Sequence, residues 1–246
     1  MMRQLQVMEA LLEMFGGMLG AAPASSPIST AAPAISPAPA QTGNQQSPPQ
    51  GRIGQGSRVL VIGDSHTAGA YGNELDRQLR ARGAQVHTIG SSGASASNFI
   101  NGRGTTVGYA EHGTDGRVQR TARHATPKLE DLIQQDRPDT IVVNLGANFR
   151  GASPAQLQSQ VRSLGEVARR HNIPIKWVGP PKPRQADAGA VQRFDEQMAA
   201  AVAPFGEYIS SVPYTPEYAG GDGVHYGGTR GTQLAQQWAQ GIAGRL

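Results

Sequence analysis

The sequence predicts one α/β domain in which helices cover both faces of a parallel sheet. From residue 57 onward, short apolar runs alternate with segments whose apolar residues recur every three or four positions. That alternation is typical of strand–helix–strand units and of a parallel sheet. The 190 residues of this part of the chain are also enough to bury a single core.

The predicted strands are apolar runs of the kind that is buried on both faces of a parallel sheet. The first run ends at Gly63, and a glycine at that point is suited to a sharp change of direction. In chain order the runs cover residues 58–62, 85–89, 140–145, 173–178 and 208–209. We therefore expect a parallel sheet of about five strands.

The predicted helices carry their apolar residues on one face. In the first helix these residues recur at every fourth position, namely Tyr71, Leu75 and Leu79. Gly83 is suited to end that helix. Two further helices are expected to begin at Thr126 and Ser153, because each is a capping residue followed by proline. The last two are expected over residues 188–203 and around Trp238.

The first 56 residues differ in composition from the rest. No charged residue lies between Glu13 and Arg52, and seven of the 17 prolines fall between Pro23 and Pro49. A segment rich in Ala, Pro, Ser and Gln cannot bury enough apolar surface to offset the entropy lost on ordering. We therefore expect a disordered linker over 21–56 ahead of a domain over 57–246.

Residues 1–20 allow two interpretations. Apolar residues recur at intervals of three and four, at Leu5, Met8, Leu12, Phe15 and Leu19. This spacing predicts an amphipathic helix that docks on a membrane surface or on another protein. The alternative is an atypical secretion leader, although Glu9 and Glu13 interrupt its apolar region. A location in the cell envelope or outside the cell is favoured over the cytoplasm.

Composition excludes several classes of function. The chain has no cysteine, which excludes disulfides, a thiol nucleophile and thiolate metal sites. The net charge of +4 favours an anionic partner weakly. No basic run or aromatic-interleaved patch indicates nucleic acid as a partner.

Four short polar motifs lie where chemistry is expected in such a sheet, because ligands bind at the carboxyl ends of parallel strands. They are Gly63-Asp64-Ser65-His66, Gly90-Ser91-Ser92-Gly93-Ala94-Ser95, Gly146-Ala147-Asn148 and Asp222-Gly223-Val224-His225. Each alone is explained by a helix cap or a turn. Together they contain a hydroxyl nucleophile, donors for an oxyanion, a carboxylate and a base, which are the groups that acyl transfer requires.

This combination resembles the SGNH hydrolases, also called GDSL-type esterases, which carry Ser, Gly, Asn and His in four separate blocks. The resemblance covers nearly all of 57–246 and implies a flavodoxin-like three-layer α/β/α domain. It implies that Ser65 is the nucleophile, His225 the base and Asp222 the carboxylate that orients the base. It further implies an oxyanion hole formed by the amides of Ser65 and Gly93 and the side chain of Asn148. No metal or organic cofactor is implied.

The sequence departs from the family pattern at three positions. His66 stands where leucine is common, and it could contact the substrate, cap the helix or pack. Thr88 stands where the second block usually has asparagine, so a structural hydrogen bond is expected to differ. Phe149 follows Asn148 where aspartate is frequent. The residues counted as possible substrate contacts are His66, Arg103, Phe149 and Arg150.

A polar, glycine-rich insertion over 101–126 has two interpretations. Its arginines and histidines could form a basic lip that binds an anionic glycan, or the segment could be a solvated loop. Its few large apolar residues disfavour a lid for long acyl chains and favour small acyl groups. Among family members, a compact domain behind a disordered tether resembles the carbohydrate O-deacetylases, including those that act on peptidoglycan.

Three hypotheses for function follow. The first is a serine esterase that removes acetyl groups from a carbohydrate, such as a cell-wall glycan, through an acyl-enzyme. The second is a lipid or thioester hydrolase with the same residues. The third is a catalytically weak, tethered module that binds a glycan.

Overall fold

The computed structural model describes residues 51–105, 107–220 and 222–246. The helix expected at 1–20 and most of the linker expected at 21–56 lie outside the described residues. Ile53 is buried, and its backbone N–H donates to the carbonyl oxygen of Leu246 at 2.8 Å. The folded domain therefore includes residues ahead of the expected start at residue 57.

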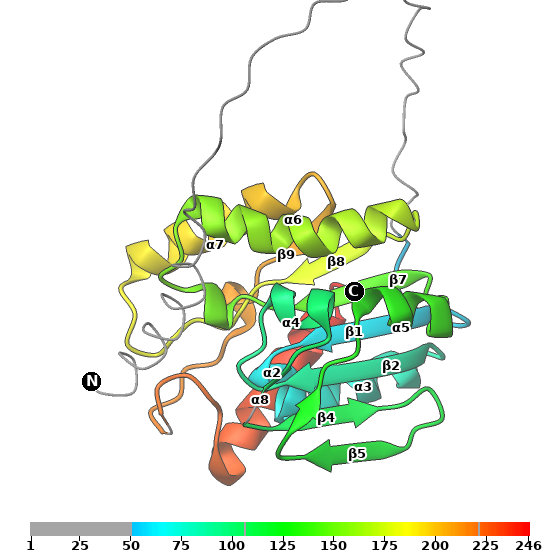
Figure 1. Ribbon diagram of the computed structural model, residues 1–246. Coiled ribbons are helices and arrows are strands. Elements are labelled where there is room, and N and C mark those ends of the chain that lie inside the picture. Colours follow the sequence, from blue (N-terminus) through cyan, green and yellow to red (C-terminus); the bar gives the residue numbers. More distant parts are fainter. Residues whose placement is uncertain (1–50, 106, 221) are drawn as a thin grey trace, which may run out of the picture. The chain divides into compact units, whose positions relative to one another are not determined.

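The domain is built on a seven-stranded sheet with strand order β5-β4-β2-β1-β7-β8-β9 (Figure 1). The five expected strands are present and parallel to one another. They are β1 (Arg58–Gly63), β2 (Gln85–Ser91), β7 (Thr140–Asn144), β8 (Ile175–Val178) and β9 (Gly206–Ile209). The α/β fold class that the sequence predicts is confirmed.

The expected number of about five strands is wrong, because the insertion over 101–126 adds antiparallel strands. β4 (Tyr109–His112) pairs with β2, and β5 (Val118–Thr121) pairs with β4 at the sheet edge. β3 (Gly104–Thr105) and β6 (His124–Ala125) form a separate two-stranded ladder. The sequence of β5 is polar and exposed, so no apolar run marked it. Its place in the sheet depends on backbone hydrogen bonds, which any side chain permits.

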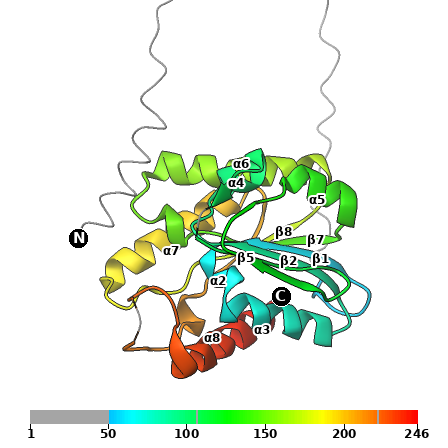
Figure 2. The ribbon, with the colours of Figure 1, turned by 60° about the horizontal axis from the view of Figure 1, so that its bottom comes forward.

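Helices cover both faces of the sheet (Figure 2). One face carries α3 (Ala70–Ala81) and α8 (Gly228–Ala243), which pack against each other. The other face carries α4 (Ala96–Asn101), α5 (Leu129–Asp136), α6 (Pro154–Arg170) and α7 (Ala188–Val202). Of the helices in the described ranges, none is both long and apolar enough to cross a membrane.

The central strand β1 contributes to a hydrophobic core on each face. Val59 and Val61 join the core under α3 and α8, where Trp238 also lies. Leu60 and Ile62 point to the opposite core, against the four other helices. Burial on both faces explains why this strand is apolar at four consecutive positions, from Val59 to Ile62, rather than at alternate ones.

The two expected proline-containing helix starts had different outcomes. Ser153 caps α6 as expected, since its hydroxyl accepts the backbone N–H of Gln156. Thr126 does not cap α5, which begins only at Leu129. The Thr126 hydroxyl instead donates to the carbonyl oxygen of Asn98, at 2.9 Å, and so attaches the chain to α4.

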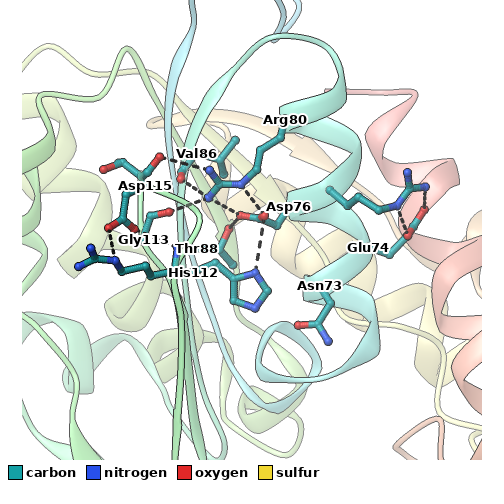
Figure 3. A network of polar contacts seen from close by, with 12 residues as sticks. Asn73, Glu74, Asp76, Arg80, Val86, Thr88, His112, Gly113 and Asp115 are labelled. Carbon is teal, nitrogen blue, oxygen red and sulfur yellow. Dashed lines mark hydrogen bonds and ion pairs between the residues drawn. The ribbon is translucent and has the colours of Figure 1, made fainter.

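A polar network attaches the β4–β5 hairpin to α3 (Figure 3). The carboxylate of Asp76 on α3 accepts from Arg80 at 2.7 Å and from the Thr88 hydroxyl of β2 at 2.8 Å. Arg80 also donates to the carbonyl oxygen of Gly113 in the hairpin at 2.9 Å. The His112 ring lies 3.6 Å from the same carboxylate. Thr88, one of the departures from the family pattern, therefore has a buried hydrogen-bond partner.

The pKa of Asp76 depends on this network. Burial raises that pKa, but the hydrogen bonds from His112, Arg80 and Thr88 together outweigh burial and hold it below its ordinary value. A carboxyl group whose pKa is lower in the folded chain stabilises the fold above its unfolded pKa. That stabilisation is lost as the pH falls through the folded pKa.

We expect Asp76→Asn to lower the free energy of unfolding at pH 7 by about 3 kcal/mol, because the buried Asp76 carboxylate is lost as the partner of Arg80, whose side chain is partly buried. The deficit should shrink as the pH falls below about 3.9, the pKa of aspartate in an unfolded chain. Urea unfolding across this pH range would measure both effects. Asp115→Asn is the control, since that exposed carboxylate pairs only with the exposed Arg117; equal losses for both variants would contradict the prediction.

Candidate active site

Three side chains form a hydrogen-bonded chain at the carboxyl end of the sheet. Ser65 begins α2 (Ser65–Ala68) directly after β1. Asp222 and His225 lie in the segment between the short helix η2 (Val212–Tyr214) and α8. Ser65 Oγ lies 2.8 Å from His225 Nε2, and His225 Nδ1 lies 2.6 Å from Asp222 Oδ2.

The position of Ser65 depends on two close approaches of α2, one to β1 through the Thr67 side chain and one to β2 through the helix backbone. A Cβ at Gly63 would lie 2.0 Å from the Thr67 hydroxyl oxygen. A Cβ at Gly90, at the end of β2, would lie 2.1 Å from the backbone nitrogen of Ala68. Only glycine therefore lets α2 start this close to both strands. The Ser65 hydroxyl is thereby placed at the carboxyl end of the sheet.

Asp64 caps α2 from a buried position. Its carboxylate accepts the backbone N–H of His66 at 3.1 Å. Burial raises the pKa of Asp64 to about 6, against the opposing effects of the His66 amide and the charges of His225 and Arg150. The serine thus follows a capped helix start, where free backbone N–H groups favour negative charge.

Asp222 is held ionised by a set of donors. Besides the His225 ring, it accepts the backbone N–H groups of Val224 at 2.9 Å and of His225 at 2.7 Å. Burial raises its pKa, but these hydrogen bonds outweigh burial and hold the pKa well below the ordinary value. A carboxylate on Nδ1 favours the tautomer with its proton there, which leaves Nε2 free to accept the Ser65 proton.

Gly93 and Asn148 meet beside this chain of residues. Gly93 has a φ of +79° in the turn after β2. Asn148 lies in the short helix η1 (Ala147–Phe149) after β7, and its Nδ2 donates to the Ala94 carbonyl oxygen at 2.9 Å. Among the described residues, the backbone N–H groups of Ser65 and Gly93 donate to no protein acceptor. The segments that follow the adjacent strands β2, β1 and β7 thus place N–H donors at one end of the sheet.

His66 packs beneath the imidazole of His225. It is buried, with its ring centroid 5.2 Å from that of His225 and 5.4 Å from that of Trp238. Burial, helped by the charges of His225 and Arg150, lowers the pKa of His66 to about 3. The side chain is therefore neutral above that pH, and its position favours packing over the alternative of substrate contact.

The other three residues counted as possible substrate contacts differ in how deeply they are buried. Phe149 lies in the hydrophobic core, so its ring is removed from the candidate contacts. Arg150 is partly buried and donates to the carbonyl oxygen of Pro181, and burial lowers its pKa to about 10. Arg103 is exposed, and its carbonyl oxygen accepts from Thr126 at 2.7 Å, so its backbone has a structural role.

Arg184 holds the segment that carries Asp222 and His225, a role that no sequence motif predicted. Its guanidinium donates to the carbonyl oxygen of His225 at 2.8 Å and lies 3.7 Å from Asp222 Oδ1. Its backbone N–H donates to the carbonyl oxygen of Gly223 at 3.2 Å. One residue of the loop between β8 and α7 therefore contacts this segment at three points.

Two tyrosines fix the guanidinium of Arg184. It lies 4.8 Å from the ring centroid of Tyr218 and 5.4 Å from that of Tyr226, which are cation–π distances. Only 9% of its side chain is exposed. The sequence carries no spacing signal for this role, because the partners are backbone carbonyls and rings about 40 residues away.

No group of three or more metal-ligating side chains occurs in the described ranges. The arrangement that does occur, a hydroxyl, an imidazole and a carboxylate with spare N–H donors, contains the groups needed for nucleophilic acyl transfer.

The chain is similar to known proteins in its three-dimensional structure. No family model and no curated protein matches the sequence. TesA matches with a TM-score of 0.51 and 19% identity, over 75% of this chain and 95% of its own. The esterase EstA from Pseudoalteromonas sp. matches with a TM-score of 0.52 and 15% identity, over 77% and 97%. Axe2, an acetylxylan esterase from Geobacillus stearothermophilus, matches with a TM-score of 0.50 and 14% identity, over 78% and 96%.

These matches define the fold class. The chain shares the central parallel sheet and its two helical layers with these three proteins, over nearly the whole length of each matched chain. The chain has the SGNH hydrolase fold, as the sequence resemblance implies.

We expect Arg184→Gln to lower kcat for ester hydrolysis by about 10-fold to 100-fold, since a displacement of about 1 Å in a reacting group has effects of this size. Arg184→Lys should recover part of the loss, because a lysine keeps the charge but not the forked donor. Steady-state kinetics and melting temperatures would be measured for both.

Lys182→Gln is the matched control for these variants. Lys182 lies in the same loop and pairs with the exposed Glu217 at 3.1 Å. Wild-type kcat is expected for this variant. Unchanged kcat in Arg184→Gln, from a folded protein, would show that the segment keeps its geometry without Arg184.

Proposed function

We propose that the protein is a serine-dependent esterase that removes small acyl groups, acetyl in particular, from a carbohydrate. The observation that carries the proposal is the Ser65–His225–Asp222 chain, with distances of 2.8 and 2.6 Å, at the carboxyl end of the sheet. A sheet of the SGNH hydrolase fold supports the same chemistry. Neither feature alone would be sufficient, because the fold does not determine the function.

In the proposed mechanism, His225 Nε2 takes the Ser65 proton as the serine oxygen bonds to the ester carbonyl carbon. The carbonyl oxygen becomes an anion, which the amides of Ser65 and Gly93 and the Asn148 side chain stabilise. The imidazolium then gives its proton to the alcohol oxygen as the carbon–oxygen bond breaks. Water attacks the acyl-serine by the same route, and the acid and the free serine are released.

The openness of the site supports a polar substrate attached to a large molecule. About half of each partner side chain is exposed, with 48% for His225 and 57% for Asp222. Arg150 and Arg184 place positive charge nearby, which suits a glycan that carries carboxylates. Axe2, which shares the fold, is an acetylxylan esterase.

The remaining alternatives make different predictions for the same assay. A lipid or thioester hydrolase would show rates that rise with acyl length. A tethered glycan-binding module would bind a polymer and show no turnover through Ser65. The proposed surface docking through residues 1–20 is a separate hypothesis, since deletion of that segment would change localisation and not hydrolysis.

We expect the full chain to hydrolyse p-nitrophenyl acetate, with kcat/KM falling from acetate to butyrate to octanoate, because the insertion over 101–126 carries few large apolar residues that could hold a long chain. Ser65→Ala should remove the activity, since Ser65 supplies the hydroxyl that contacts His225 Nε2 in the described part of the chain. Release of p-nitrophenol measures both. Rates that increase toward octanoate would favour the lipid hydrolase, and Ser65-independent turnover would reject the proposed nucleophile.

We expect Asn148→Ala to lower kcat by about 100-fold to 1,000-fold with little change in KM, since an oxyanion donor acts in the transition state. Asn101→Ala is the control, because Asn101 is an exposed asparagine whose Nδ2 donates within α4 to Ser97 at 3.0 Å. A large rise in KM with unchanged kcat would instead indicate that Asn148 binds the ground state.

A further inference from the structure

Val107 is an exposed apolar side chain at the proposed active site. It is 71% exposed, in the segment between β3 and β4. Its Cγ2 lies 3.8 Å from the point that a Cβ on Gly93 would occupy. The valine therefore stands directly beside the glycine whose amide is a proposed oxyanion donor.

Hydrogen bonds on both sides hold Val107 at this position. The Ser92 N–H donates to the carbonyl oxygen of Gly108 at 2.8 Å, immediately after the valine. Ahead of it, the hydroxyl groups of Ser91 and Thr105 lie 2.9 Å apart. The turn after β2 and the segment around Val107 thus form one unit.

The sheet order determines which part of an ester would meet Val107. His225 must protonate the leaving alcohol, so the alcohol has to lie on the His225 side of Ser65. His225 is held by Arg184, from the loop after β8. Val107 lies on the other side of β1, where β2 and β4 are found. The acyl group, which points away from the alcohol, therefore extends toward Val107.

We propose that Val107 is the residue that sets acyl-chain length, because its side chain forms the wall against which the acyl group packs. The inference rests on the proposed esterase function and deepens it. On this proposal the methyl group of an acetyl ester is accommodated beside Val107, and each further methylene has to displace the valine or pass around it. The insertion that carries Val107 thus supplies the selectivity for small acyl groups.

The test compares kcat/KM for p-nitrophenyl acetate, propionate and butyrate with the full chain. Val107→Ala opens the wall, and the butyrate-to-acetate ratio should rise about tenfold, a typical effect for one or two methylenes in an apolar site. Val107→Phe narrows it, and the same ratio should fall. Opposite changes in the two variants are the expected result, with melting temperatures close to that of the wild type since the side chain is exposed.

Val118→Ala and Val118→Phe are the matched controls. Val118 is also an exposed valine of the insertion, at 55%, but it lies on the edge strand β5. Its variants should keep the wild-type ratio. A second series keeps the acetyl group and varies the alcohol, and Val107→Ala should leave the preference among alcohols unchanged.

The outcomes separate this inference from the proposed function. If the wild type hydrolyses esters through Ser65 but both Val107 variants keep its acyl ratio within twofold, the inference is wrong and the esterase remains. A change in alcohol preference without a change in acyl preference also overturns it. If the wild type shows no Ser65-dependent hydrolysis of any ester, the proposed function fails first.

Discussion

The close packing of α2 against the ends of β1 and β2 is the constraint on which the rest of the site depends. At Gly90 the backbone of α2, and at Gly63 the Thr67 side chain of α2 together with the Asn144 carbonyl oxygen, lie too close for any side chain to fit. This contact places Ser65 at the carboxyl end of the sheet and leaves its backbone N–H without a protein acceptor among the described residues. It also brings the turn that contains Gly93 beside the serine, because that turn follows β2 directly. A larger residue at either glycine would displace Ser65 and the turn that contains Gly93 together, so the two positions act as one structural unit.

The imidazole side of the site is supported in another way. Asp222 and His225 lie in an irregular segment, whose geometry depends on side chains rather than on a ladder of backbone hydrogen bonds. From one side Arg184 contacts this segment at three points. From another side, the His66 ring packs against His225 and is itself supported by the ring of Trp238. The neutral state of His66 matters here, because a second positive charge beneath the imidazole would oppose its protonation during the proposed reaction.

Much of the fold was predictable because burial on both faces makes the parallel strands continuously apolar. β4 and β5 were not, since their pairing uses backbone groups and their side chains are partly exposed. The residues of the candidate site were found as short motifs at strand ends, where topology limits the possibilities. The role of Arg184 could not be predicted, because only the folded chain shows which residues it contacts. Phe149 was counted as a possible substrate contact, but its ring lies in the hydrophobic core, which its place beside Asn148 in the sequence does not reveal.

The edge strand β5 has a consequence for how the molecules behave at high concentration. The end of a sheet presents unpaired N–H and C=O groups that could join the sheet of another molecule. Here the outermost strand reads Val-Gln-Arg-Thr, is mostly exposed and carries the charge of Arg120. A charged, four-residue edge is a poor template for a further strand. The insertion therefore covers the apolar strand β2, which would otherwise be the edge on this side of the sheet, and it gives the domain a means of resisting fibril-like association there.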